Sequence, residues 1–67
     1  MPRLNTTLKQ VRQRNGMTQS ELATLVGVRR ETIIRLEAGA YNPSLKLALD
    51  IAHVFDTTVE KLFSFDE

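Results

Sequence analysis

The stretch that decides the fold is Thr18–Gly39, TQSELATLVGVRRETIIRLEAG, which is typical of two short helices joined by a tight turn at Gly27. Thr18 and Glu21 have the spacing of a capping box, in which the Thr18 hydroxyl accepts from the amide of Glu21 and the Glu21 carboxylate accepts from the amide of Thr18. A helix is therefore expected to begin at Gln19. Gly27 tolerates the positive φ that ends a helix at low cost.

A second helix is predicted over Arg29–Ala38, ended by Gly39. In the first helix, the apolar positions with helical spacing are Leu22, Ala23, Leu25 and Val26. In the second, Val28, Ile33 and Leu36 share one side, and the other side carries Arg30, Glu31, Ile34 and Arg35. Two helices that cross steeply about a short turn form a helix-turn-helix, whose second helix lies in the major groove of DNA.

The stretch closely resembles the phage-repressor/Cro group of helix-turn-helix regulators, the xenobiotic-response-element-like family. The matching residues are Thr18-Gln19, Leu22-Ala23, Gly27-Val28, Thr32-Ile33, Leu36-Glu37 and Gly39, and the match extends from Arg12 through Asn42-Pro43-Ser44-Leu45 and Ile51-Ala52 to Leu62-Phe63. The resemblance therefore covers nearly the whole chain. It implies an all-α, five-helix, lambda-repressor-like domain over residues 1–67, with the helix-turn-helix at residues 18–39.

The resemblance also implies which residues contact DNA. The positions that read bases correspond to Arg30, Glu31, Ile34 and Arg35. An arginine can bond the O6 and N7 acceptors of guanine, a glutamate can accept from cytosine N4, and isoleucine can touch a thymine methyl group. The predicted phosphate contacts are Thr18, Gln19, Arg29, Tyr41 and Asn42, with free amides at the helix start assisting Gln19. For Tyr41, packing over the edge of the core is an equal alternative.

Two further positions depend on the resemblance. The family usually has Ser or Thr where Arg29 stands, so the helix after it loses a cap of about 1 kcal/mol. Arg29 also places a cation at the positive end of the helix dipole, and we expect it to serve phosphate or base instead. Arg12 lies near the buried stripe and needs a partner there. In the family it pairs with the residue at Glu37, which makes both residues scaffold.

The charges divide the chain into two halves. Residues 1–35 hold seven cations against two carboxylates, a net charge of +5, whereas residues 36–67 hold two cations against six carboxylates, a net charge of −4. This asymmetry favours one face for a polyanion such as DNA and another kept away from it. The alternative is that the charges are simply scattered over solvated helices.

Outside the helix-turn-helix, capping signals predict three more helices. Asn5 or Thr6 can cap a first helix that runs to about Asn15, after a short extended arm. Ser44 can cap a helix over Leu45–Phe55, whose buried face is expected to hold Leu45, Ala48, Ile51, Ala52 and Phe55. Thr57 and Glu60 have the spacing of a second capping box, which predicts a last short helix.

The C-terminal tail, Leu62–Glu67, alternates apolar and polar residues with the period of a strand. It could pair with the arm at Arg3-Leu4, pack against a partner subunit, or fray. A chain of this size cannot easily bury all of its apolar residues. The sequence therefore predicts a homodimer interface away from the cations, formed by Leu47, Leu49, Phe63 and Phe65.

Other classes of function find little support in the sequence. There is no cysteine, and the single histidine, His53, has no partner at ligand spacing, so no metal or cofactor site is predicted. No glycine-rich phosphate loop and no paired nucleophile and base suggest an enzyme. No small-molecule ligand is evident. Without a signal segment or a membrane span, the chain is expected to be cytoplasmic.

The function predicted from the sequence is sequence-specific binding of double-stranded DNA by a transcriptional regulator, most simply a repressor that binds a palindromic operator as a homodimer. One alternative is an antitoxin, which would bind DNA with the same residues and mask a toxin with its apolar C-terminal surface. Another is a helical protein-interaction module, which would not need Arg29, Arg30 and Arg35 exposed together.

Overall fold

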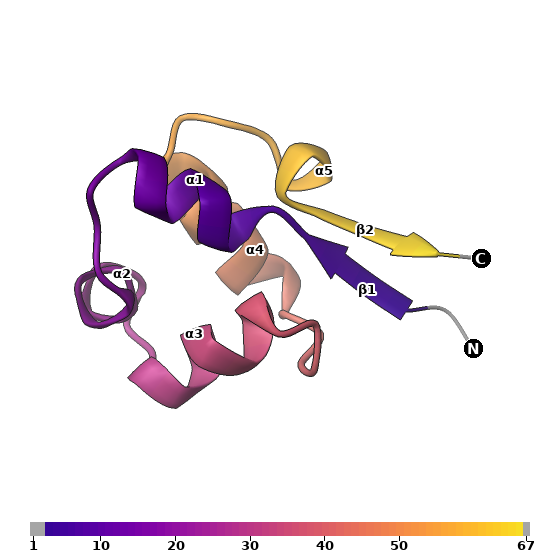
Figure 1. The fold of residues 1–67 in the computed structure, drawn as a ribbon, viewed down its shortest axis with the longest axis horizontal. Coiled ribbons are helices and arrows are strands. Elements are labelled where there is room, and N and C mark those ends of the chain that lie inside the picture. Colours follow the sequence, from indigo (N-terminus) through magenta and orange to yellow (C-terminus); the bar gives the residue numbers. More distant parts are fainter. Residues whose placement is uncertain (1–2, 67) are drawn as a thin grey trace.

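The computed structural model describes residues 3–66 and contains five helices and one two-stranded sheet in that range. In chain order the elements are β1 (Arg3–Thr6), α1 (Leu8–Arg14), α2 (Gln19–Val26), α3 (Arg30–Glu37), α4 (Leu45–Val54), α5 (Val59–Leu62) and β2 (Phe63–Asp66). Figure 1 shows the helices around a common centre, with the two strands beside each other and projecting at one side. The expected five helices and the pairing of the two ends are confirmed.

The helix starts follow the capping signals in two cases. Thr18 accepts from the amide of Glu21 at 3.0 Å, and the Glu21 carboxylate accepts from the amide of Thr18 at 2.9 Å, so the predicted capping box at α2 is present. Ser44 accepts from the amide of Leu47 and caps α4 as predicted. These bonds satisfy amides that a helix start would otherwise leave without partners.

The end of α3 packs directly against the sheet. Gly39 follows α3 with a φ of 72°, and the amides of Gly39 and Ala40 bond back to the carbonyls of Leu36 and Arg35. A Cβ atom on Gly39 would lie 2.8 Å from the carbonyl oxygen of Leu4 in β1. Only glycine accommodates both the positive φ and this close approach, so Gly39 allows the end of α3 to pack against β1.

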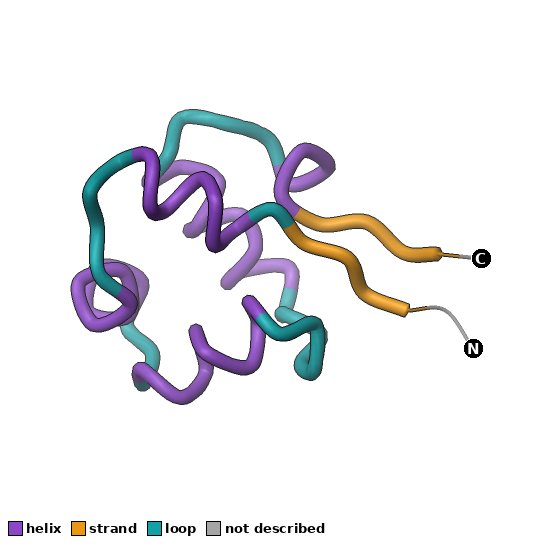
Figure 2. Tube along the Cα trace, in the orientation of Figure 1, coloured by secondary structure: helices purple, strands orange, loops and turns teal. Residues whose placement is uncertain are grey.

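The sheet pairs β1 with β2 in the antiparallel sense, with Arg3 opposite Asp66 and Leu4 opposite Phe65. The two strands run side by side in Figure 2. Thr7 continues the ladder through its amide, which donates to the carbonyl of Leu62. An isolated pair of four-residue strands is marginal in water, and here Leu4 and Phe63 anchor it by inserting into the core.

Two predicted helix starts were wrong. The first helix begins at Leu8, not directly after Asn5 or Thr6, because residues 3–6 pair with β2 instead. The cap of α5 is Thr58, whose hydroxyl accepts from the amide of Lys61. The predicted box of Thr57 and Glu60 is therefore absent. With Thr58 as the cap, a capping box would need its glutamate at position 61, and Glu60 lies one position before that.

The buried face of α4 also differs from the prediction. It consists of Leu47, Ala48, Ile51 and Ala52, whereas Leu45 is 73% exposed and Phe55 is only partly buried. Both sets of residues fit a helical stripe, and packing of α4 against α2 and α5 selects between them. On α2, Leu22 and Ala23 are buried as expected, but Leu25 is 61% exposed.

Candidate nucleic-acid interface

Helix α3 is held from one side and exposed on the other. Ile33 and Leu36 are fully buried in the core, and α3 packs chiefly against α2 and also against α1. The four side chains predicted to read bases, Arg30, Glu31, Ile34 and Arg35, are all exposed. The helix therefore presents two cations, one carboxylate and one apolar side chain together, which is the set of groups that can distinguish base edges in the major groove.

The start of α3 lacks a side-chain cap. Arg29 occupies the N-cap position with φ −79° and ψ 154°, close to the backbone angles of Thr18 before α2, but its side chain makes no capping bond. The expected loss of a side-chain cap at the start of α3 is therefore present. Because Arg29 is exposed beside Arg30, its charge is free to meet a phosphate or a base.

A buried ion pair locks α3 to α1. Arg12 donates to Glu37 from Nε at 2.6 Å and from Nη2 at 3.0 Å, and the two side chains are only 9% and 4% exposed. Arg12 also donates from Nη1 to the carbonyl of Met17 at 2.9 Å. The hydrogen bond to Glu37 raises the pKa of Arg12, so the guanidinium stays charged. The scaffold role implied by the resemblance agrees with this geometry.

Gln19 belongs to the same network. Its Nε2 donates to Glu37 Oε1 at 3.1 Å, and the residue is partly buried. This bond was not foreseen, because Gln19 was predicted only as a phosphate contact. An amide nitrogen has a second hydrogen, so the side chain can still donate outward, but its orientation is set by Glu37.

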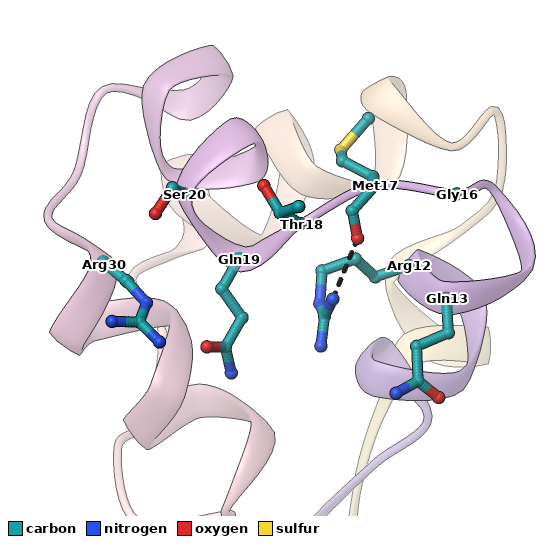
Figure 3. Close-up of a pocket in the computed structure, with 8 residues that line it drawn as sticks. All are labelled: Arg12, Gln13, Gly16, Met17, Thr18, Gln19, Ser20 and Arg30. Atoms are coloured by element: carbon teal, nitrogen blue, oxygen red, sulfur yellow. Dashed lines mark hydrogen bonds between the residues drawn. The ribbon is translucent and has the colours of Figure 1, made fainter.

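Gln19 and Thr18 line an open hollow of about 650 Å³ beside α3. Its lining residues are Arg12, Gln13, Gly16, Met17, Thr18, Gln19, Ser20 and Arg30. In Figure 3 the side chain of Gln19 lies between those of Arg30 and Arg12, and the dashed line marks the bond from Arg12 to Met17. The hollow therefore combines the first turn of α2, whose early amides lack helical partners, with the exposed cation of Arg30.

Four lining residues, Gln13, Gly16, Met17 and Ser20, were not named in the sequence analysis. Ser20 is the second residue of α2, next to Gln19, and Gln13 lies in the last turn of α1. The capping box alone locates the α2 start and so points to Ser20. Nothing in the local sequence indicates Gln13, because its position depends on how α1 packs.

The remaining predicted phosphate contacts lie on the surface. Tyr41 is 40% exposed and Asn42 is exposed, in the loop that connects α3 to α4. Thr18 is exposed too, and its hydroxyl oxygen already accepts from Glu21.

The capping box at the start of α2 lowers the pKa of Glu21. The hydrogen bond with the Thr18 backbone amide is the larger cause, and the hydrogen bond with the Thr18 side chain is the next. The cap therefore adds stability above the unfolded pKa of Glu21, and the gain is lost as pH falls through the folded pKa.

The four residues predicted for a dimer interface separate into two groups. Leu47 and Phe63 are 7% and 8% exposed and belong to the core, so these two do not offer the exposed surface that the predicted interface needs. The sheet accounts for Phe63, and the orientation of α4 accounts for Leu47. Leu49 and Phe65 remain on the surface, at 41% and 52% exposure.

Other kinds of site find no support in the described part of the chain. Residues 3–66 contain no group of three or more His, Cys, Asp or Glu side chains that could hold a metal ion. His53 is exposed on α4. None of the described helices has the length and apolar character needed to cross a membrane.

Comparison with known proteins gives the same class of fold and site. A helix-turn-helix family model matches residues 8–62. An "uncharacterized HTH-type transcriptional regulator" of Archaeoglobus fulgidus is 58% identical over 64 residues, which cover 96% of this chain and 90% of the relative. The "uncharacterized HTH-type transcriptional regulator YgzD" of Bacillus subtilis is 42% identical over 60 residues, 90% of this chain and 91% of the relative.

Among solved structures, the restriction-modification controller protein C.AhdI from Aeromonas hydrophila superimposes with a TM-score of 0.75 and 34% identity, covering 84% of this chain and 85% of that one. The exposed second helix and its scaffold therefore define a DNA-binding helix-turn-helix protein. The chain belongs to the Cro/C1-type helix-turn-helix family of transcriptional regulators, and its curated relatives are regulators, not enzymes.

The scaffold role of Glu37 predicts a large loss of stability on substitution. Glu37→Ala leaves the charge of Arg12 buried without a partner, which costs about 3 to 5 kcal/mol. Urea unfolding measures this cost. Glu31→Ala removes an exposed carboxylate from the same helix and should change stability by less than about 0.5 kcal/mol. A Glu37→Ala variant that melts like the wild type but no longer binds DNA would contradict the scaffold role.

The missing cap of α3 predicts opposite effects on stability and binding. Arg29→Ser supplies a hydroxyl on a backbone already shaped for a cap, so the melting temperature should rise by the equivalent of about 1 kcal/mol. DNA affinity should fall, and its salt dependence should weaken by about one phosphate contact. Arg14→Ser removes the same charge from α1 and serves as the control. An unchanged salt dependence in Arg29→Ser would argue against a phosphate contact.

Proposed function

We propose that this chain is a repressor that binds a palindromic DNA operator as a homodimer and acts by occupying the site. The observation that carries the proposal is the exposed side of α3, where Arg30, Glu31, Ile34 and Arg35 lie on a helix fixed by buried contacts. Occupancy of a duplex requires affinity and specificity but no chemistry. The groups available on the surface are suited to that task.

Base readout is assigned to α3. Arg30 and Arg35 present planar forks of donors that match the two acceptors of guanine in the major groove. Both guanidinium groups are exposed, so neither has to leave the core to reach a base. We therefore expect guanine in each half-site.

Phosphate contacts are assigned to the rim around α3. Gln19 and Thr18 lie at the start of α2, Arg29 at the start of α3, and Tyr41 and Asn42 in the loop after it. Phosphate contacts fix the register of a protein on DNA without reading sequence. On this assignment the rim clamps one strand on each side of the reading helix.

The homodimer follows from specificity. One recognition helix reads only a few base pairs, which is too little to select a site among many competitors. A two-fold dimer with recognition helices about 34 Å apart meets two half-sites one turn apart. Phe65, half exposed at the end of β2, and Leu49 on α4 are the remaining residues of the predicted interface. Self-association would cover them.

The assignment of base contacts predicts that specificity depends on Arg30 and Arg35. Either Arg→Ala substitution should weaken binding to the preferred site by about 1 to 3 kcal/mol and relax the base choice at one position. Selection of bound sites from a random duplex pool identifies the wild-type site and the changed position. Tyr41→Phe removes only a hydroxyl from the rim and should weaken all duplexes alike. If both arginine variants keep the wild-type preferences, base readout lies elsewhere.

The assignment of the dimer interface predicts that Phe65→Asp weakens self-association and operator binding together. The new carboxylate would have to be desolvated in the interface, whereas the isolated fold should change little because Phe65 is 52% exposed. Sedimentation at micromolar concentration measures the oligomeric state. Ser64→Asp places the same charge on the other face of β2 and is the matched control. A wild-type chain that sediments as a monomer would refute the dimer.

A further inference from the structure

Among the described residues, Ile34 is the one large apolar side chain that α3 exposes, at 40%. The other exposed large apolar residues are Leu25, Tyr41, Leu45, Leu49 and Phe65, and none of them lies on α3. An exposed isoleucine on a reading face gains free energy only where DNA offers an apolar contact. In the major groove the apolar feature of a base edge is a methyl group at C5 of a pyrimidine.

Ile34 does not act alone on this face. Glu31 precedes it by three residues, so the two side chains are neighbours on the helix surface, with Cβ atoms about 5 to 6 Å apart. Both are exposed, and no hydrogen bond within residues 3–66 occupies the Glu31 carboxylate. The pair therefore offers an acceptor and an apolar group side by side.

The two groups make different demands on a base. A carboxylate needs an N–H donor, which cytosine provides at N4 and adenine at N6. The O4 of thymine is an acceptor and would be repelled. Ile34 needs a methyl group, which thymine has and unmodified cytosine lacks. One base carries both features on adjacent ring atoms, the N4 donor and the C5 methyl: 5-methylcytosine.

We propose that Glu31 and Ile34 together form a binding site for 5-methylcytosine in the major groove, so that cytosine methylation of the operator strengthens binding. This inference rests on the proposed base readout by α3. Arg30 and Arg35 flank the pair on the same helix and provide forks for a neighbouring guanine, so a methylated cytosine-guanine step fits the whole set. Methylation leaves the N4 donor in place, so Glu31 keeps its bond while Ile34 gains its contact.

The test compares three random duplex pools for the wild-type chain. One is unmodified, one carries 5-methylcytosine in place of cytosine, and one carries uracil in place of thymine. After selection, the best sites are measured singly with and without methylation. Burying one methyl group corresponds to about a fourfold gain in affinity for each methylated half-site. The uracil pool should give the same best sites as the unmodified pool, since thymine is not the base read by the pair.

Two variants assign the effect to the two side chains. Ile34→Ala should reduce the gain from methylation to less than about twofold, and Glu31→Gln should admit thymine at the same position because an amide can donate as well as accept. Leu25→Ala removes an exposed apolar residue of α2 and should leave the methylation gain unchanged.

The outcomes separate this inference from the proposed function. Equal affinity for methylated and unmethylated sites, or a methylation gain that survives Ile34→Ala, overturns the 5-methylcytosine site while base readout by α3 stands. A preference for thymine over uracil that Ile34→Ala removes shows that Ile34 reads thymine, which also overturns it. Failure of all three pools to bind would refute the proposed function itself.

Discussion

The structure depends on the buried ion pair between Arg12 and Glu37. Charges this deeply buried lose most of their hydration, and the attraction between them largely offsets that loss without adding much net stability. Their effect is on orientation. Two hydrogen bonds join the pair. Arg12 also donates to the Met17 carbonyl, and the Gln19 side-chain amide donates to Glu37. Since these residues come from α1, α2, α3 and the turn between the first two helices, one network fixes the orientation of α3 relative to α1 and α2.

The charges are divided along the sequence. The cations Arg29, Arg30 and Arg35 belong to the half of the chain with net charge +5, whereas α4, α5 and β2 belong to the half with net charge −4. The sheet joins the two halves, because Arg3 of β1 lies opposite Asp66 of β2. The sheet packs against the end of α3 through Gly39. A partner bound at the sheet would therefore contact an element that packs directly against α3.

Sequence reasoning succeeded for most local signals, and the capping box predicted at Thr57 is the exception. The capping box at Thr18, the turn at Gly27 and the cap at Ser44 each depend on a few consecutive residues, and each is present. It failed where distant parts of the chain decide. Leu47 and Leu45 both fit a stripe on α4, and only packing against other helices buries the first. The exposed side of α3 was predicted correctly from the helical spacing of its apolar residues. The bond from Gln19 to Glu37 was not predicted, because it joins residues 18 positions apart.

Two departures from good folding rules lie at α3. Arg29 replaces a cap, and Ile34 is a β-branched apolar residue facing solvent. Each lowers stability slightly, the first because α3 has no side-chain cap and the second because a β-branched side chain has a restricted rotamer. Elsewhere the chain has side-chain caps at α2, α4 and α5 and no described buried side-chain polar atom lacking a partner. It also departs from the rules away from α3, since Thr7 makes no capping bond at α1 and Asp56 has a φ of 51°. Leu25 and Leu45 are more exposed than Ile34. The two departures at α3 lie among the side chains proposed to contact DNA, where a gain in binding would offset a small loss of stability. They coincide with the face that the buried ion pair orients.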